Sequence, residues 1–183
     1  DFVVNRNQVT AVKTNRGNIE CGCVVQAVAG TSSLLMNKLK IRSPIQTFPL
    51  QAMVSQPFKP FLNPLVSSSA LHCYVQQTSR GEIVFGGGSD PYPLYNTRST
   101  LDLKESLLAH AIEMFPFMAN VKLMRQWAGM TDMTPDYSPI MGQSPYDNYY
   151  LDAGWGTWGF KATPICGKTM AELVATGRTP DLI

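Results

Sequence analysis

Residues 148–164 read Asn-Tyr-Tyr-Leu-Asp-Ala-Gly-Trp-Gly-Thr-Trp-Gly-Phe-Lys-Ala-Thr-Pro and combine a strand, a glycine-rich turn and a helix start. The apolar run 149–153 predicts a short strand. Three glycines follow it, at Gly154, Gly156 and Gly159. Thr163 and Pro164 are typical of an N-cap and a first helical residue, so we expect the helix to begin there. Free N–H groups at such a turn face anions or polar ring edges, so the stretch predicts a site for a polar ligand.

Two nucleotide-binding motifs overlap this stretch, but the surrounding sequence argues against both. Gly154-x-Gly156-x-x-Gly159 matches the dinucleotide fingerprint, which also needs a second parallel strand with an acidic residue about 20 positions later. Asp181 lies near that distance, but no strand pattern accompanies it. Residues 162–169 resemble a phosphate-binding loop, yet the helical pattern places Gly167-Lys168 inside the helix, where they cannot cradle phosphate. We therefore expect the glycine turn to serve a ligand in another way.

The composition describes a globular chain without a nucleic-acid or membrane signature. Its 183 residues suffice for one domain or two small lobes, and 44% of them are hydrophobic. No apolar run reaches the roughly 18–20 residues that span a bilayer, and no signal-peptide pattern opens the chain. The net charge is +2 and the basic residues are scattered, so no nucleic-acid surface is predicted.

The cysteines and histidines predict reduced thiols and no metal site. Four dispersed cysteines make no CxxC motif, and only two histidines could join them: Cys21, Cys23, Cys73, Cys166, His72 and His110. Buried, reduced thiols are typical of cytoplasmic proteins, which is the expected location. Because the sequence opens at Asp1 within a strand pattern, we expect it to be a fragment of a longer protein.

The predicted elements divide the chain into two lobes. The ends are predicted to contain strand–turn–helix units: a hairpin within 9–21, an apolar strand at 24–28 buried on both faces, a helix at 33–39 and the stretch quoted above. The middle is strand-rich, with strands at 45–56, 71–78, 82–87 and 121–133 and a helix at 101–115. Residues 1–44 and 134–183 are expected to form one lobe, and residues 45–133 an inserted second lobe. The predicted fold class is α+β, with a mostly antiparallel sheet and flanking helices.

Two C-terminal segments resemble the D-amino-acid oxidase superfamily of FAD-dependent oxidoreductases, and within it the sarcosine oxidase β-subunit family. These segments are 125–142 and 154–164, with weaker matches at 24–30, 72–78 and 81–87. These segments occur in the same order as in the family and extend over nearly the whole chain. They correspond to the C-terminal half of the family's proteins. The resemblance implies that residues 1–44 and 134–183 are the C-terminal part of an FAD-binding α/β lobe. It also implies that residues 45–133 are the substrate domain.

The resemblance implies FAD as the cofactor. The glycine turn would face the pyrimidine edge of the flavin, where reduction places negative charge that a helix dipole stabilises. The Ala29–Gly30 turn would approach the nucleotide part. Gly129 stands where monomeric members have a cysteine linked covalently to the flavin, so no such linkage is expected. The expected cofactor-binding residues are Ala29, Gly30, Gly129, Gly154, Gly156, Thr157, Gly159, Phe160 and Lys161.

The catalytic residues stay unassigned. The active-site histidine and tyrosine of the monomeric members align with Gly88 and Thr131, so no acid or base can be carried over. The superfamily's FAD fingerprint lies in an N-terminal half that this sequence does not contain. Tight FAD binding is therefore expected to need that half, and the isolated chain is expected to be inactive. Asp132 and Asp136 are predicted to cap turns around Thr134-Pro135.

Lys161 is the expected substrate-binding residue. A cation near a helix N-terminus opposes the helix dipole by a few tenths of a kcal/mol up to about 1 kcal/mol, and an anionic ligand offsets this cost. In the superfamily, the residue at this position can hold the substrate carboxylate. The alternative interpretation is a solvated surface lysine, which is the commonest role of lysine.

The resemblance implies oxidation of sarcosine or a similar N-methyl amino acid by hydride transfer to the flavin. One alternative is a related flavoenzyme acting on D-amino acids, glycine, dimethylglycine or proline. Another is a catalytically silent module that docks on other oxidase subunits or self-associates. The expected partners are thus an amino-acid substrate and other oxidase subunits or a second copy, with no nucleic acid and no membrane.

Overall fold

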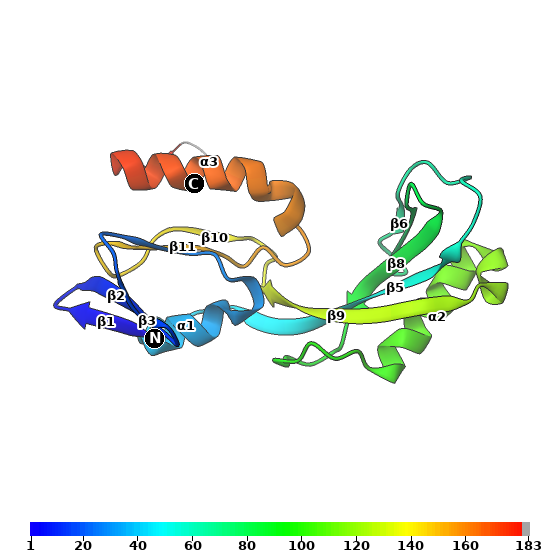
Figure 1. Cartoon of the computed structure of the whole chain (residues 1–183), viewed down its shortest axis with the longest axis horizontal. Helices are drawn as coiled ribbons and strands as arrows, with labels where there is room; N and C mark the ends of the chain where they lie inside the picture. The colour runs from blue at the N-terminus through cyan, green and yellow to red at the C-terminus, as the bar shows by residue number, and fades with distance from the viewer. Residues whose placement is uncertain (181–183) are drawn as a thin grey trace. The chain divides into compact units, whose positions relative to one another are not determined.

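The chain forms two compact units in a computed structural model that describes residues 1–180 (Figure 1). Unit 1 comprises Asp1–Thr47 and Thr131–Ile183, and unit 2 comprises Phe48–Met130. Asp181, the acidic residue weighed for the dinucleotide fingerprint, lies outside the described residues. That unit 1 is an FAD-binding lobe and unit 2 a substrate domain stays a prediction.

In the part of unit 1 up to residue 180, there are two small sheets and two α-helices. The first sheet is an antiparallel meander of β1 (Phe2–Asn5), β2 (Gln8–Thr14) and β3 (Gly17–Glu20). The second has the order β10 (Ile140–Gln143), β11 (Tyr149–Ala153), β4 (Val24–Gln26). β10 pairs with β11 antiparallel, and β11 pairs with β4 parallel. After β4 come the 3-10 helix η1 (Ala29–Thr31) and α1 (Ser32–Lys38), and after β11 comes α3 (Gly159–Thr176).

The core of unit 1 is built around Tyr149, whose side chain is fully buried. Its ring meets that of Phe2 edge to face, with 5.4 Å between the centroids. Its hydroxyl donates a hydrogen bond of 2.5 Å to Oε1 of Gln26, which is also buried. This bond joins β11 to β4 inside an apolar core that includes Val9, Met36 and Leu151.

The expected burial of the 24–28 strand on both faces is wrong for the part of the chain that the structure describes. Gln26 is buried, but Val25 is 42% exposed and Val28 is also exposed. The reason is that β4 is an edge strand, hydrogen-bonded to β11 alone within residues 1–180, and that α3 packs mainly on β10 and β11 and so leaves part of the β4 face open.

Unit 2 is built on a mostly antiparallel sheet covered on one face by helices. The strand order is β6 (Val66–Ser68), β7 (Cys73–Gln77), β8 (Glu82–Ser89), β5 (Gln46–Pro57), β9 (Leu123–Met133). The helix α2 (Leu101–Met114) packs on β7 and β8, and the 3-10 helix η2 (Pro116–Asn120) follows it. The core side chains of this layer include Met53, Val75, Ile83, Phe85, Leu107 and Ala111. The predicted α+β class with mostly antiparallel pairing is confirmed.

The four cysteines are free thiols, but only Cys73 and Cys166 are buried, whereas Cys23 is exposed. Burial raises the pKa of the Cys73 thiol. None of the helices within residues 1–180 is long and apolar enough to cross a bilayer.

Candidate functional site

The parallel pairing of β4 with β11 places two loops at the same end of their sheet. This carboxyl edge is the side of the sheet at which both strands finish. Tyr149 pairs with Val24 and Leu151 with Gln26, so both strands end in the same direction. The Ala29–Gly30 turn follows β4, and the glycine turn Gly154–Gly159 follows β11. Ligands of open α/β sheets bind outside the carboxyl ends of parallel strands, so this edge is the candidate site.

The helix behind the glycine turn begins earlier than the sequence predicts. α3 starts at Gly159 with Trp158 as its N-cap, and Pro164 lies inside the helix. The prediction that Thr163 caps the helix is wrong, since its hydroxyl donates to the carbonyl of Gly159 one turn back. As predicted, Gly167 and Lys168 lie within the helix, where their amides cannot cradle a phosphate.

Two glycines of the turn have backbone conformations that disfavour other residues. Gly154 has φ of +78° and Gly156 has φ of +54°. A Cβ atom on Gly154 would lie 2.8 Å from Cγ2 of Thr134. Glycine at these positions lets the chain reverse tightly between β11 and α3.

Asp132, near the end of β9, binds this turn through two hydrogen bonds. The amide of Gly154 donates to the carboxylate Oδ2 of Asp132 at 2.6 Å, and the amide of Gly156 donates to the Asp132 carbonyl at 2.8 Å. The predicted turn-capping role of Asp132 around Thr134-Pro135 is therefore wrong. It is confirmed for Asp136, whose Oδ1 accepts from the amide of Ser138, and this bond lowers the pKa of the Asp136 carboxyl.

Four amides at the start of α3 have no acceptor among residues 1–180: those of Thr157, Gly159, Phe160 and Lys161. The first paired amide of the helix is that of Ala162, which donates to the carbonyl of Trp158 at 3.2 Å. Thr157 is exposed, and Phe160 is 97% exposed. The positive end of the α3 dipole thus presents several free donors at the molecular surface.

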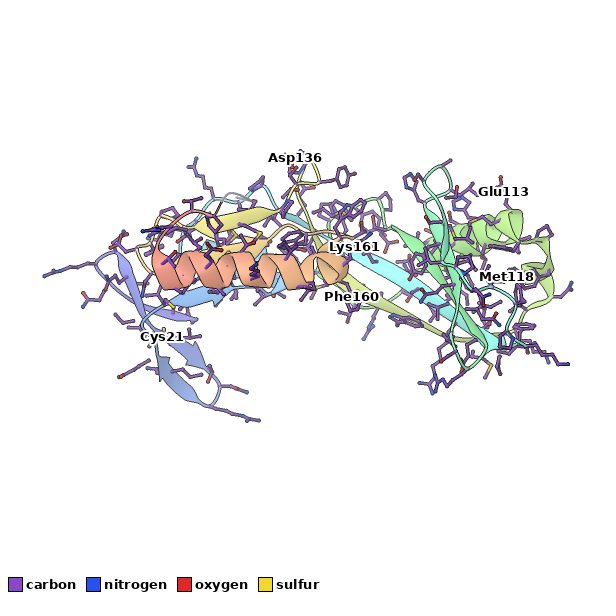
Figure 2. The ribbon with its side chains drawn as sticks, turned by 90° about the horizontal axis from the view of Figure 1, so that it is seen from above. Cys21, Glu113, Met118, Asp136, Phe160 and Lys161 are labelled. Atoms are coloured by element: carbon purple, nitrogen blue, oxygen red, sulfur yellow. The ribbon has the colours of Figure 1, made fainter. Side chains whose placement is uncertain are left out.

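Lys161 adds a positive charge to this helix end. Its Nζ lies 4.1 Å from the centroid of the Trp158 ring, within the range of a cation–π contact. Figure 2 shows Phe160 and Lys161 together at the first turn of α3. The Trp158 contact is not predicted from the sequence pattern alone, although the i, i+3 spacing indicates it once α3 is known to begin at Gly159.

The remaining predicted residues divide between the two units. Ala29 is exposed with φ of +45°, and Gly30 is buried, with its carbonyl accepting from the Thr47 hydroxyl at 2.7 Å. Gly129 lies on β9 in unit 2, where it is exposed and a Cβ atom would meet nothing within 4 Å. The structure therefore brings together the residues of the two loops within unit 1, whereas Gly129 belongs to unit 2.

Two buried hydroxyls next to these segments lack a hydrogen-bond partner within residues 1–180, namely Ser32 Oγ and Thr131 Oγ1. Ser32 starts α1 behind the Ala29–Gly30 turn, and Thr131 precedes Asp132. Buried polar atoms are nearly always satisfied by protein, water or ligand. The free amides and the charge of Lys161 make this edge suited to a polar, negatively charged ligand.

Comparison with known proteins relates the chain to flavoenzymes. A family model described as "FAD dependent oxidoreductase" matches residues 2–173. The chain is 43% identical over 173 residues to the sarcosine oxidase subunit beta of Rhodobacter capsulatus, covering 94% of this chain and 42% of that protein. It is 42% identical over 174 residues to the Arthrobacter sp. protein of the same name, covering 95% and 43%. The chain thus spans less than half the length of these relatives.

A solved structure is also similar to this chain in both fold and sequence. L-proline dehydrogenase from P. horikoshii superimposes with a TM-score of 0.88 and 33% sequence identity. The match covers 97% of this chain and 49% of that one.

Proposed function

Because the chain belongs to the family of FAD-dependent oxidoreductases, we propose that it is the C-terminal portion of a flavoenzyme that oxidises sarcosine or a similar N-methyl amino acid. The observation that carries the proposal is the glycine turn with its free amides and adjacent lysine at the start of α3. The substrate class is supported by the 42–43% identity to relatives named sarcosine oxidase subunit beta.

The residues at the carboxyl edge of β4 and β11 fit FAD. Free amides of Thr157, Gly159 and Phe160 at a helix N-terminus suit the carbonyl and nitrogen atoms of a flavin pyrimidine ring. The Ala29–Gly30 turn lies at the same sheet edge and would approach the nucleotide part. FAD, when bound, supplies the hydride acceptor for amine oxidation. The role of Gly129 beside the flavin rests on the family resemblance alone.

The chain's own contribution is electrostatic and orienting. Amides fixed at a helix N-terminus stabilise negative charge on a neighbouring ring without the cost of reorganising solvent. The α3 dipole, equivalent to about half a positive elementary charge at this end, acts in the same direction. These groups would favour the reduced, negatively charged ring over the oxidised one.

Lys161 would bind the substrate carboxylate. Its ammonium group is held over the Trp158 ring within one turn of the free amides. A carboxylate at this position would form a charge-assisted hydrogen bond and remove the unfavourable contact between the lysine and the helix dipole. Fixing the carboxylate orients the carbon next to the amine nitrogen, which is a positioning contribution to catalysis.

The relatives' names also bear on partners. The relatives described above are named as subunits, so we propose that the full-length protein assembles with other oxidase subunits.

One alternative function is that of a catalytically silent module, which would bind no FAD and would dock on other subunits. A related substrate is the alternative within the family, and the 33% identity to a proline dehydrogenase favours proline among these.

The test uses the full-length protein in its assembled state. Its visible spectrum is recorded, and then sarcosine, proline, glycine, dimethylglycine and a D-amino acid are added separately without oxygen. The proposal predicts bound FAD that sarcosine bleaches fastest. Fastest bleaching by proline or by a D-amino acid would reassign the substrate, and a protein without flavin would support the silent module.

The same spectrum of the isolated 183-residue chain tests the need for the remaining half. Weak or no FAD binding is expected. Tight, stoichiometric FAD would contradict this expectation.

A further inference from the structure

We propose that Asp132 is a positioning residue that holds the glycine turn in the geometry needed to contact the flavin. The inference rests on the proposed function, because it assigns a purpose to the turn only if the turn faces FAD. Asp132 itself would contact neither FAD nor substrate. It would act through Gly154 and Gly156.

Both hydrogen-bonding parts of Asp132 act on the same turn. The side chain accepts from the Gly154 amide at 2.6 Å, and the main-chain carbonyl accepts from the Gly156 amide at 2.8 Å. Asp132 is only 2% exposed, so water does not compete effectively for the Gly154 bond. A hydrogen bond to a carboxylate is roughly twice as strong as one between neutral groups.

The turn needs an external constraint because glycine does not define its own conformation. Gly154 and Gly156 both have positive φ, and glycine loses more conformational freedom on ordering than any other residue. The two bonds fix alternate peptides of the segment that leads into Thr157 and α3. The direction of the free amides of Thr157, Gly159 and Phe160 therefore depends on them.

Met133 and Thr134, which follow Asp132, lie close to the glycine turn. Cγ2 of Thr134 would lie 2.8 Å from a Cβ on Gly154, and Sδ of Met133 would lie 3.5 Å from one on Gly156. The turn therefore has little space for larger residues beside this segment, and the Asp132 bonds hold it there. The segment from Asp132 to Thr134 thus lies against the turn and anchors it through Asp132.

The test compares two variants that remove the same charge. Asp132→Asn keeps an oxygen acceptor for the Gly154 amide, and Asp132→Ala removes it. In the assembled full-length protein, Asp132→Ala is expected to raise the Kd for FAD about 10-fold or more. Its flavin reduction potential is expected to be more negative than that of Asp132→Asn, because misaligned amides no longer favour the reduced ring. Asp132→Asn is expected to keep an FAD affinity close to that of the unmodified protein.

Hydrogen exchange gives a readout that does not depend on bound FAD. In the apoprotein, amide exchange in the peptide covering the glycine turn should be faster in Asp132→Ala than in Asp132→Asn. Asp136→Ala is the matched control, because Asp136 is an exposed carboxylate four residues away whose Oδ1 accepts from the Ser138 amide and not from the glycine turn. It should leave exchange, affinity and potential unchanged.

The outcomes separate the two proposals. If the unmodified protein binds no FAD, the proposed function fails, and the inference fails with it. If the protein binds FAD but Asp132→Ala and Asp132→Asn have the same affinity and potential, Asp132 is not a positioning residue, and the proposed function stands. If Asp132→Ala does not fold, Asp132→Ser replaces it, because its shorter hydroxyl does not reproduce the acceptor position of the carboxylate.

Discussion

The ammonium nitrogen of Lys161 lies 4.1 Å from the centroid of the Trp158 ring, so the lysine charge is held at the N-terminal end of α3. A cation–π contact at an exposed site contributes about 0.5–1 kcal/mol. That is comparable with the cost of placing a cation at the positive end of a helix dipole. The pair therefore keeps a positive charge beside free amides at little net cost in stability, which prepares the site for an anion.

Replacing Lys161 should weaken substrate binding. Lys161→Met keeps the apolar part of the side chain but removes its charge, so the KM for sarcosine in the full-length protein should rise about 10-fold or more. Lys168→Met is the control, because Lys168 is exposed further along α3. Steady-state kinetics gives both values, and an unchanged KM in Lys161→Met would exclude the carboxylate role.

Gly154→Ala should destabilise unit 1 and disturb the turn. The new Cβ would lie 2.8 Å from Thr134 Cγ2 at φ of +78°, so we expect a loss of about 1–3 kcal/mol from strain and overpacking. Gly167→Ala offers a control within α3, where a Cβ meets nothing within 4 Å. It should stabilise the helix by about 0.5–1 kcal/mol. Urea unfolding followed by tryptophan fluorescence measures both changes, and equal stabilities would contradict the packing described for Gly154.

Much of the fold could be predicted because the apolar residues of most segments are the ones that the structure buries. The apolar run 149–153 predicts β11 with its observed bounds, and the apolar face of 101–115 predicts α2. The α3 start was misplaced because Thr163-Pro164 has the composition of a helix start, whereas Gly159 and Phe160 are poor indicators of one. The burial of Val25 was mispredicted because its apolar side chain indicates a strand suited to burial but does not indicate which elements of residues 1–180 cover it.

The site could be predicted from the sequence only in part, because local patterns indicate local motifs but not bonds between distant residues. The glycine turn is a local motif, and the family match confirms the resemblance on which its interpretation depends. The Asp132 bond to Gly154 joins residues 22 positions apart, so no local pattern indicates it. An acidic residue within an apolar strand pattern was the available signal, because buried carboxylates usually have a partner.

Tyr149→Phe should destabilise the core of unit 1. The substitution removes the 2.5 Å hydrogen bond to Gln26 Oε1 and leaves that buried acceptor unpaired. A cost of about 1–3 kcal/mol follows from the desolvation of the acceptor. Thermal or urea unfolding measures it, and an unchanged stability would show that Gln26 finds another donor.

The same tyrosine should make stability depend on alkaline pH. Burial raises the pKa of Tyr149 to about 12 from an ordinary value of 10.0. The folded state therefore holds this proton more tightly than the unfolded state, so its contribution to stability is complete below pH 10 and is lost between about pH 10 and 12. Tyr149→Phe should lack this part of the decline. Identical pH profiles for the two proteins would rule out Tyr149 as its source.

In the proposed function, the glycine turn and the start of α3 contact the flavin's pyrimidine edge. A crystal structure of the full-length protein with FAD and a carboxylate inhibitor measures this directly. We expect amide nitrogens among Thr157, Gly159 and Phe160 at about 2.7–3.2 Å from that edge, with Lys161 Nζ at a similar distance from the inhibitor carboxylate. A flavin ring bound elsewhere, with these amides facing only solvent, would contradict it.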